Sequence, residues 1–221
     1  MISITTNVLL YVTAACALAL PRVPLLETRE TGASAASQLL QVAPKSNTCD
    51  NSPFPIECAT ADQAAPYLIS AMVTYGVTSL QEIAALISVI AFETKDFKYN
   101  TNHFPGLPGQ GTRNMQMANF NFLYAKSIPT LATRLSAITT ASSSVGLSDD
   151  QLNAIRALVL PDEFSWGSAA WFLTTQCAHI RPQIRTGGHE GYTAYLQCIG
   201  TDMTEERMAY WVRANNALGV S

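Results

Sequence analysis

The stretch from Leu80 to Glu93 is apolar on nearly every side of a helix, and this limits how the rest of the chain can be arranged. Ser79-Leu80-Gln81-Glu82 has the form of a capping box, which starts a helix. From Ile83 to Phe92 only Ser88 is polar. A helix that is apolar all round belongs in the middle of a core, and this one is too short between its charged ends to cross a bilayer. We therefore predict a buried central helix.

A carboxyl group stands where this helix ends. Glu93 is followed by a loop, Thr94 to Arg113, that is rich in Asn, Gly, Pro and aromatic residues. Partial burial and the negative end of the helix dipole both raise the pKa of a carboxyl group. Glu93 could then stay protonated near neutral pH and donate a proton to a leaving oxygen. The alternative is a helix-terminal Glu that points into solvent or pairs with Lys95.

The first 46 residues are expected to lie outside the folded domain. Residues 1–20 carry no charged side chain, and an apolar run ends in Ala17-Leu18-Ala19, which is typical of a secretory signal peptide at residues 1–19. A buried N-terminal helix is the alternative, which Pro21 and Pro24 disfavour. Residues 20–46 show no sustained period and predict a flexible leader or pro-segment. Residues 47–221 would form the domain of a secreted, extracellular protein.

Cysteine usage agrees with secretion. Cys16 would leave with the signal peptide, so four cysteines remain, an even number that suits an oxidising compartment. They allow three pairings, of which we favour Cys49–Cys58 with Cys177–Cys198. Metal binding is the competing interpretation, but the cysteine and histidine spacing fits no standard zinc pattern. We expect no metal and no cofactor.

From Thr60 onward the chain predicts helices joined by short loops. Capping-box forms begin at Thr60 and Ser148, Pro129 suits a first turn, and Gly76 and Gly219 suit helix ends. Strand signals are sparse, although residues 98–117 could hold a small β-hairpin. We therefore predict one mainly α domain with two disulfides. The net charge of −3 and the lack of a basic run give no sign of nucleic acid or an anionic membrane as a partner, and we expect a monomer.

Several short motifs resemble those of the lysozyme superfamily. Ile87-x-x-Ile90-Ala91-Phe92-Glu93-Thr94-x-x-Phe97 is similar to the helix end of these enzymes. Residues 109–117, Gly-Gln-Gly-Thr-Arg-Asn-Met-Gln-Met, resemble the G-x-x-G-L-M-Q segment of goose-type lysozymes and lytic transglycosylases, and also the G-R-G-x-x-Q-L segment of family 19 chitinases. Residues 168–173 and 198–200, followed by Arg207 and Tyr210, are similar to the family 19 layout. The resemblance covers about residues 80–219 and implies an α+β, lysozyme-like fold.

The resemblance also implies roles for particular side chains. Glu93 would be the general acid that protonates a glycosidic oxygen, and Gln116 would line a sugar cleft. The other expected sugar contacts follow from proximity alone: Tyr99, Asn100, Asn114 and Asn119. An ordinary Asn-rich loop is the alternative for this cluster, because Asn and Gly favour turns.

The second carboxylate of a glycosidase is missing from its usual place. Family 19 enzymes have another Glu on the loop soon after the first, whereas residues 99–104 contain no acid here. Asp96 and Glu190 are the two candidates for the base. Goose-type lysozymes and lytic transglycosylases depend chiefly on one Glu, so this absence leaves a single-acid mechanism open.

These observations lead to the hypothesis of a secreted glycoside hydrolase. It would cleave β-1,4 bonds of N-acetylated amino-sugar polymers, with peptidoglycan as first substrate and chitin as second, by hydrolysis or transglycosylation. The alternative is a secreted, non-catalytic carbohydrate-binding or effector protein on the same fold. A structural protein with an ordinary core helix is a third possibility.

Overall fold

The computed structural model describes residues 34–220, and these residues fold mainly into helices. In chain order the elements are α1 (Ala35–Val42), η1 (Pro44–Asn47), α2 (Ala61–Thr74), α3 (Leu80–Glu93), α4 (Ala118–Ser127), α5 (Pro129–Ile138), α6 (Asp149–Val159), α7 (Asp162–Ser165), α8 (Ser168–Thr175), η2 (Ala178–Ile180), α9 (Arg181–Arg185), α10 (Gly188–Cys198) and α11 (Glu205–Leu218). The predicted mainly helical, single-domain class is confirmed.

Helix α3 is the centre of the core. Every residue from Glu82 to Ala91 is buried, as the apolar pattern predicts. Helix α11 packs along α3, and α1, α8 and α9 also contact it. The one polar side chain in the apolar run, Ser88, is satisfied because its hydroxyl lies 2.8 Å from Ala85 O and 3.1 Å from Tyr192 Oη.

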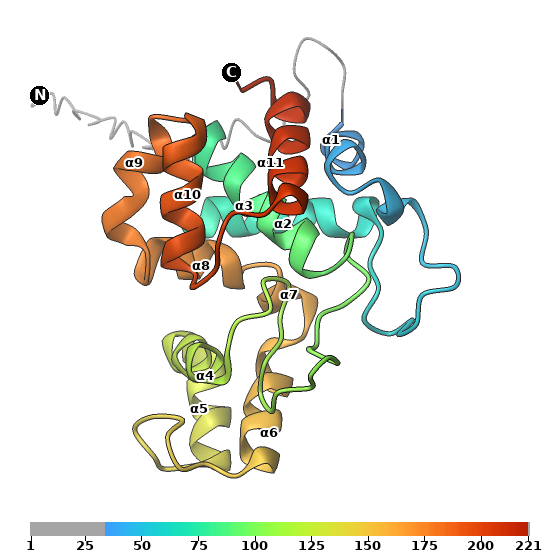
Figure 1. Cartoon of the computed structure of the whole chain (residues 1–221). Coiled ribbons are helices and arrows are strands. Elements are labelled where there is room, and N and C mark those ends of the chain that lie inside the picture. Colours follow the sequence, from blue (N-terminus) through green and yellow to red (C-terminus); the bar gives the residue numbers. More distant parts are fainter. Residues whose placement is uncertain (1–33, 221) are drawn as a thin grey trace, which may run out of the picture.

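The helices fall into two groups (Figure 1). Helices α4, α5 and α6 pack on one another in the lower part of that view. Helices α1–α3 and α8–α11 form the larger group above them, with α7 and the loop that follows α3 between the two. The end of α3 that carries Glu93 is therefore directed toward the region where the two groups meet.

Local signals account for most helix boundaries. The capping boxes at Thr60 and Ser148 form as predicted, and Gly76 and Gly219 adopt the positive φ angles of helix ends. The expected box at Ser79 does not form. Its hydroxyl bonds Gln81 instead, and the side chain of Glu82 is turned into the core toward Arg181.

Residues 98–117 contain no strand, so the small β-hairpin considered from the sequence is reduced to isolated bridges. Two antiparallel bridges occur, Thr101 with Gly111 and Gly111 with Gln116. Six non-glycine residues between 51 and 115 have positive φ angles, and two of them, Thr112 and Met115, lie in this segment. Such angles interrupt a ladder, so the segment folds as a compact loop.

The folded part of the chain begins before residue 47. Ser34 caps α1, and Leu39 and Val42 of that helix are buried against α2 and α11. The expected leader, residues 20–46, therefore includes a packed helix from Ala35 onward. The proposed signal peptide and the start of that leader lie outside the described residues.

Both predicted disulfides are present, Cys49–Cys58 and Cys177–Cys198, separated by 9 and 21 residues along the chain. Each joins segments of the larger group of helices. Within residues 34–220 no helix has the length and apolar character needed to pass through a membrane.

Candidate functional site

A cleft of about 220 Å³ opens where α3 ends. Its walls come from the end of α3, from the loop before α4 and the start of α4, from α8, and from the end of α10. The lining residues are Val89, Glu93, Gln110, Asn114, Met115, Gln116, Met117, Phe120, Phe172, Tyr195, Ile199, Gly200 and Thr201.

Glu93 is the charged group in this lining, and it is paired with Arg207 of α11. Arg207 Nη2 lies 2.7 Å from Glu93 Oε1, with 11% of the arginine side chain and 23% of the glutamate side chain exposed. The guanidinium also lies 4.1 Å from the centre of the Phe92 ring, a favourable cation–π contact. Arg207 Nη1 is buried without a hydrogen-bond partner among the described residues. A buried donor of this kind is uncommon in folded proteins.

Amide side chains line the wall that the loop provides. Gln116 is buried, and its Nε2 donates to Asn121 Oδ1 at 2.7 Å. Asn114 Oδ1 accepts from Thr112 Oγ1 and from Ser168 Oγ, both at 2.8 Å. These bonds fix how both amides are turned, so the wall is organised before any ligand arrives.

Buried Arg113 holds the same loop in place from behind. Its Nη1 donates to the carbonyl oxygens of Glu57, Phe97 and Tyr99, and its Nη2 pairs with Asp162 at 3.2 Å. Burial lowers the pKa of the Arg113 guanidinium, and Asp162 opposes this by stabilising the charge. The loop is thus tied to three other segments.

Other lining residues of the cleft are apolar or aromatic. The rings of Phe120 and Phe172 meet edge to face, with centres 4.6 Å apart. Tyr195 is fully buried, and burial raises the pKa of its hydroxyl. The lining of the cleft therefore combines a carboxylate and amide groups with apolar and aromatic side chains.

The structure brings Glu93, Asn114 and Gln116 together in the cleft, but it places the two candidate bases elsewhere. Asp96 is buried and accepts from Tyr210 Oη at 2.6 Å and from the Lys45 amide at 3.0 Å. It is committed to holding α11 and η1. Glu190 is exposed in the first turn of α10, on a separate open surface.

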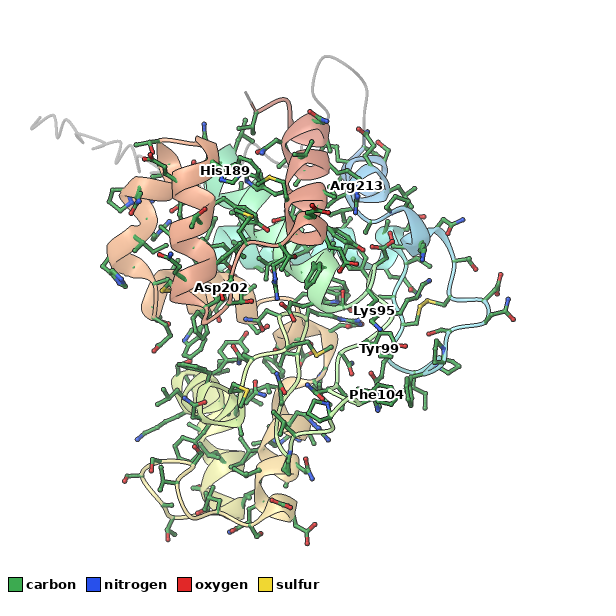
Figure 2. The ribbon with its side chains drawn as sticks, viewed as in Figure 1. Lys95, Tyr99, Phe104, His189, Asp202 and Arg213 are labelled. Atoms are coloured by element: carbon green, nitrogen blue, oxygen red, sulfur yellow. A yellow bond between two sulfur atoms is a disulfide. The ribbon has the colours of Figure 1, made fainter. Side chains whose placement is uncertain are left out.

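The other expected contacts also lie away from the cleft. Asn100 is buried, and its backbone N–H donates to the Glu57 carboxylate. Tyr99 packs near Phe54 and His103, with ring centres 5.7 and 6.0 Å away, and Asn119 is exposed on α4. Figure 2 shows Tyr99 and Phe104 in the same region as Lys95 and well apart from His189. Proximity in sequence was a poor guide because the loop turns back on itself.

Sequence reasoning assigned no role to Arg207, Gln110 or Phe172, which shape the site. Arg207 is 114 residues from Glu93 in the chain, as the numbering shows. Its position at the start of an amphipathic last helix was a signal that this helix lies on α3, but no pattern specifies the ion pair.

The described residues offer no evident metal site. Between residues 34 and 220 no group of three or more His, Cys, Asp and Glu side chains is arranged to hold a metal ion. The donor set of this cleft does not fit a metal, and we derive no step through one.

Comparison with known proteins identifies a fungal relative. A bifunctional dioxygenase–epoxy alcohol synthase of Fusarium oxysporum (strain Fo5176) is 45% identical to this chain over 160 residues. The matched region covers 72% of this chain and 12% of the Fusarium protein, so the chain spans a small part of that protein's length. No protein-family model matches the chain, and neither does any solved structure.

These findings overturn the resemblance to the lysozyme superfamily. The relative is named for dioxygenase and epoxy alcohol synthase activities, so the hypothesis of a glycoside hydrolase of muramidase or chitinase type is wrong. The roles of Glu93 as glycosidic acid and of Asp96 or Glu190 as base are withdrawn with it, as is the carbohydrate-binding or effector alternative. The motifs gave the wrong family because they are not specific to it. A buried apolar helix that ends at the surface can have Glu as its last residue and be followed by a Gly- and Asn-rich loop in unrelated proteins.

Proposed function

We propose that this chain is a ligand-binding domain that serves epoxy alcohol chemistry. Its cleft would bind an epoxy alcohol or a similarly oxygenated molecule with an apolar carbon skeleton. The observation that carries the proposal is the mixed lining, in which Glu93 and amide side chains share one cleft with Phe120 and Phe172. The match to the Fusarium protein supports the choice of ligand class, because the name of that protein includes an epoxy alcohol product.

The available polar groups suit such a ligand. A ligand hydroxyl can donate to the Glu93 carboxylate, which lines the cleft and whose charge Arg207 stabilises from behind. A hydrogen bond to a charged group contributes about 1.5–3 kcal/mol. Apolar contact with Phe120, Phe172 and Met117 would bury the carbon chain. Binding is the whole of the proposal, and no covalent step belongs to it.

The proposal does not extend to the two enzyme activities for which the larger relative is named. The matched segment is 12% of that protein, so an accessory domain is the role that fits the length of the match.

We also propose that the protein is secreted. Two disulfides are typical of an oxidising compartment. The signal peptide expected at residues 1–19 supports the same route.

The test is a titration followed by NMR on the methyl groups of Met115 and Met117, which line the cleft. We expect a straight-chain epoxy alcohol with six carbons to shift both signals at lower concentration than hexanol does. Glu93→Gln should weaken binding of the epoxy alcohol by about tenfold, because one hydrogen bond to a charged group is lost. Glu190→Gln is the matched control and should bind as the wild type does.

Two results would overturn the proposal. One is equal binding of hexanol and the epoxy alcohol, which would leave the polar wall without a role. The other is binding of an N-acetylglucosamine oligomer where the epoxy alcohol does not bind.

A further inference from the structure

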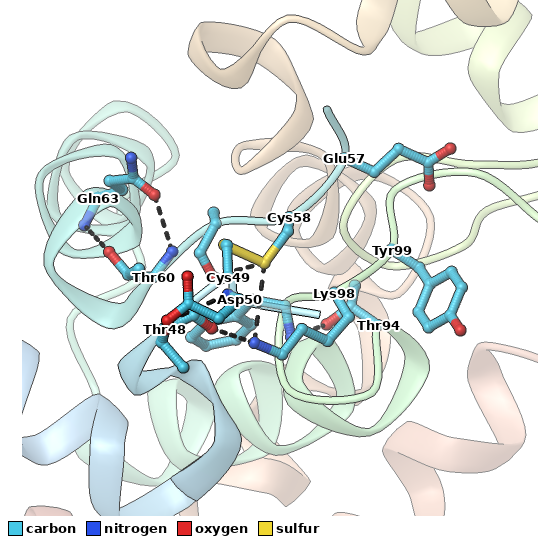
Figure 3. The surroundings of a disulfide bond; sticks show 12 residues. Thr48, Cys49, Asp50, Glu57, Cys58, Thr60, Gln63, Thr94, Lys98 and Tyr99 are labelled. Carbon is cyan, nitrogen blue, oxygen red and sulfur yellow. Dashed lines mark hydrogen bonds between the residues drawn. A yellow bond between two sulfur atoms is a disulfide. The ribbon is translucent and has the colours of Figure 1, made fainter. Parts of the chain in front are cut away.

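The two disulfides lie in different surroundings. Cys49 and Cys58 are both partly exposed, and the Lys98 ammonium donates toward Cys58 Sγ at 3.7 Å and to the carbonyl oxygen of Thr48 (Figure 3). In the second disulfide Cys177 is fully buried, while Cys198 is partly exposed. Among the described residues no lysine or arginine hydrogen bond reaches either of its sulfurs. The first disulfide is therefore accessible and has a cation beside one sulfur.

A cation beside a sulfur favours cleavage of the disulfide bond. In thiol–disulfide exchange the attacked sulfur is captured and the other leaves as a thiolate, and exchange is faster when that thiolate is stabilised. Burial lowers the pKa of Lys98, while Asp96 and Asp50 act in the opposite sense. An ammonium that has lost part of its hydration gains from a new anionic partner, which a Cys58 thiolate would supply.

The segment closed by this disulfide contacts the loop that leads into the cleft lining, at residues 100–103 and at Arg113, the neighbour of Asn114. Glu57 Oε2 accepts from the backbone N–H groups of Asn100 and Thr101 at 3.1 and 3.2 Å, and its Oε1 lies 2.7 Å from His103 Nε2. The Glu57 carbonyl oxygen accepts from Arg113. Glu57 is the neighbour of Cys58, so opening the disulfide removes a covalent restraint next to the residue that anchors the loop.

We propose that Cys49–Cys58 is a reactive disulfide that a dithiol opens, and that its opening loosens the loop wall of the cleft. A thiolate of the dithiol bonds to Cys49 Sγ, the bond between Cys49 and Cys58 breaks, and its electron pair leaves on Cys58 beside Lys98. The second thiol of the reagent then displaces Cys49 and closes a cyclic disulfide. Two electrons pass to the protein, and the thiol protons go to Cys49 and to solvent. The effect on ligand binding rests on the proposed function, whereas the reactivity does not.

The reactivity is measured on the folded full chain with dithiothreitol as the dithiol. Aliquots are alkylated with iodoacetamide, and peptide masses report the reduction of each disulfide separately. We expect Cys49–Cys58 to open at least about tenfold faster than Cys177–Cys198, since access and thiolate stabilisation act together. Lys98→Met should slow the first rate by several-fold and leave the second unchanged, while Lys98→Arg should retain most of the wild-type rate.

The second disulfide is also the control for folding in every variant. If Lys98→Met unfolded the protein, Cys177–Cys198 would open faster, and the Lys98→Arg variant would still test the charge. Equal rates for the two disulfides in the wild type would overturn the proposal. An unchanged Cys49–Cys58 rate in a folded Lys98→Met variant would also overturn it, because exposure alone would then explain the chemistry.

Hydrogen exchange tests the link to the cleft without any ligand. After selective reduction and alkylation we expect faster exchange at the amides of Asn100 and Thr101, which Glu57 holds. Amides in the middle of α6, which has no bond to Glu57 in the described structure, should be unaffected. Unchanged exchange at Asn100 and Thr101 would overturn the proposed coupling. The reduction rates and the exchange rates are measured without a ligand, so a failure of the epoxy alcohol titration would not affect either result.

Discussion

The two ends of helix α3 carry the same residue type in opposite situations. Glu82, in the first turn, is fully buried and bound by Arg181 through two contacts of 2.7 and 3.2 Å, with Arg185 at 3.2 Å. Glu93, at the last residue of the helix, has one arginine and remains partly exposed in the cleft. One end is closed by two cations, and the other is left open.

The helix dipole adds to this difference. Partial positive charge at a helix start favours Glu82, and partial negative charge at a helix end disfavours Glu93. The backbone dipole therefore stabilises the negative charge of Glu82 and destabilises the negative charge of Glu93. Arg207 offsets that destabilisation while leaving its own Nη1 without a partner. The buried Glu82 group therefore stabilises the fold, whereas the partly exposed carboxylate of Glu93 is available to a ligand.

Removing the closed pair should give the largest effect. Glu82→Gln leaves two arginines beside a neutral side chain in a buried place, and losing one partner of a buried pair costs about 3–5 kcal/mol. Urea unfolding followed by circular dichroism measures the change. Arg185→Met is the control, because Arg185 is 47% exposed and its loss should cost less than about 1 kcal/mol. Equal losses for the two variants would show that Glu82 is not held as a buried charge.

The packing around the middle of α3 can be tested by measuring stability at alkaline pH. Tyr192 bonds Ser88 of α3, and burial raises the pKa of Tyr192 to about 12. Between pH 10 and 12 the unfolded state loses this proton while the folded state keeps it, so stability falls as pH rises. Tyr192→Phe should remove roughly 2–3 kcal/mol of that fall, at 1.36 kcal/mol for each pKa unit.

The control for this measurement is Tyr67→Phe on α2, since Tyr67 is exposed and contacts neither end of α3. Its stability should fall between pH 10 and 12 as steeply as that of the wild type. If Tyr192→Phe also keeps the full fall, the burial of Tyr192 does not persist in solution. The packing of α10 against α3 would then be looser than described.

Much of this architecture is predictable from local patterns. The apolar run specifies the buried helix, the capping boxes at Thr60 and Ser148 specify helix starts, and spacing favours the two disulfides that form. These features depend on residues close together in the chain. The helix at residues 35–42 was missed, because a short amphipathic turn surrounded by Ser, Ala and Pro has too weak a period to stand out.

The site was harder to predict because it depends on distant segments. Glu93 could be singled out by its position after an apolar helix, but its partner comes from α11 and its apolar wall from α4 and α8. Asp96 illustrates the same limit. Three residues from Glu93, it has a positive φ angle that turns it away toward Tyr210, and spacing alone does not foresee such a turn.

A substitution at the open end of α3 should have the smallest effect on the free energy of unfolding. Glu93→Gln loses an ion pair to Arg207 but also relieves a negative charge at the helix end, an effect of about 0.3–1 kcal/mol in the opposite direction. We expect a net loss below about 1 kcal/mol in urea unfolding, which is within the range of a surface change such as Glu190→Gln. A loss as large as that of Glu82→Gln would mean that Glu93 and Arg207 form a second structural pair. The carboxylate would then be needed by the fold, and its exposure in the cleft would be no argument for a ligand.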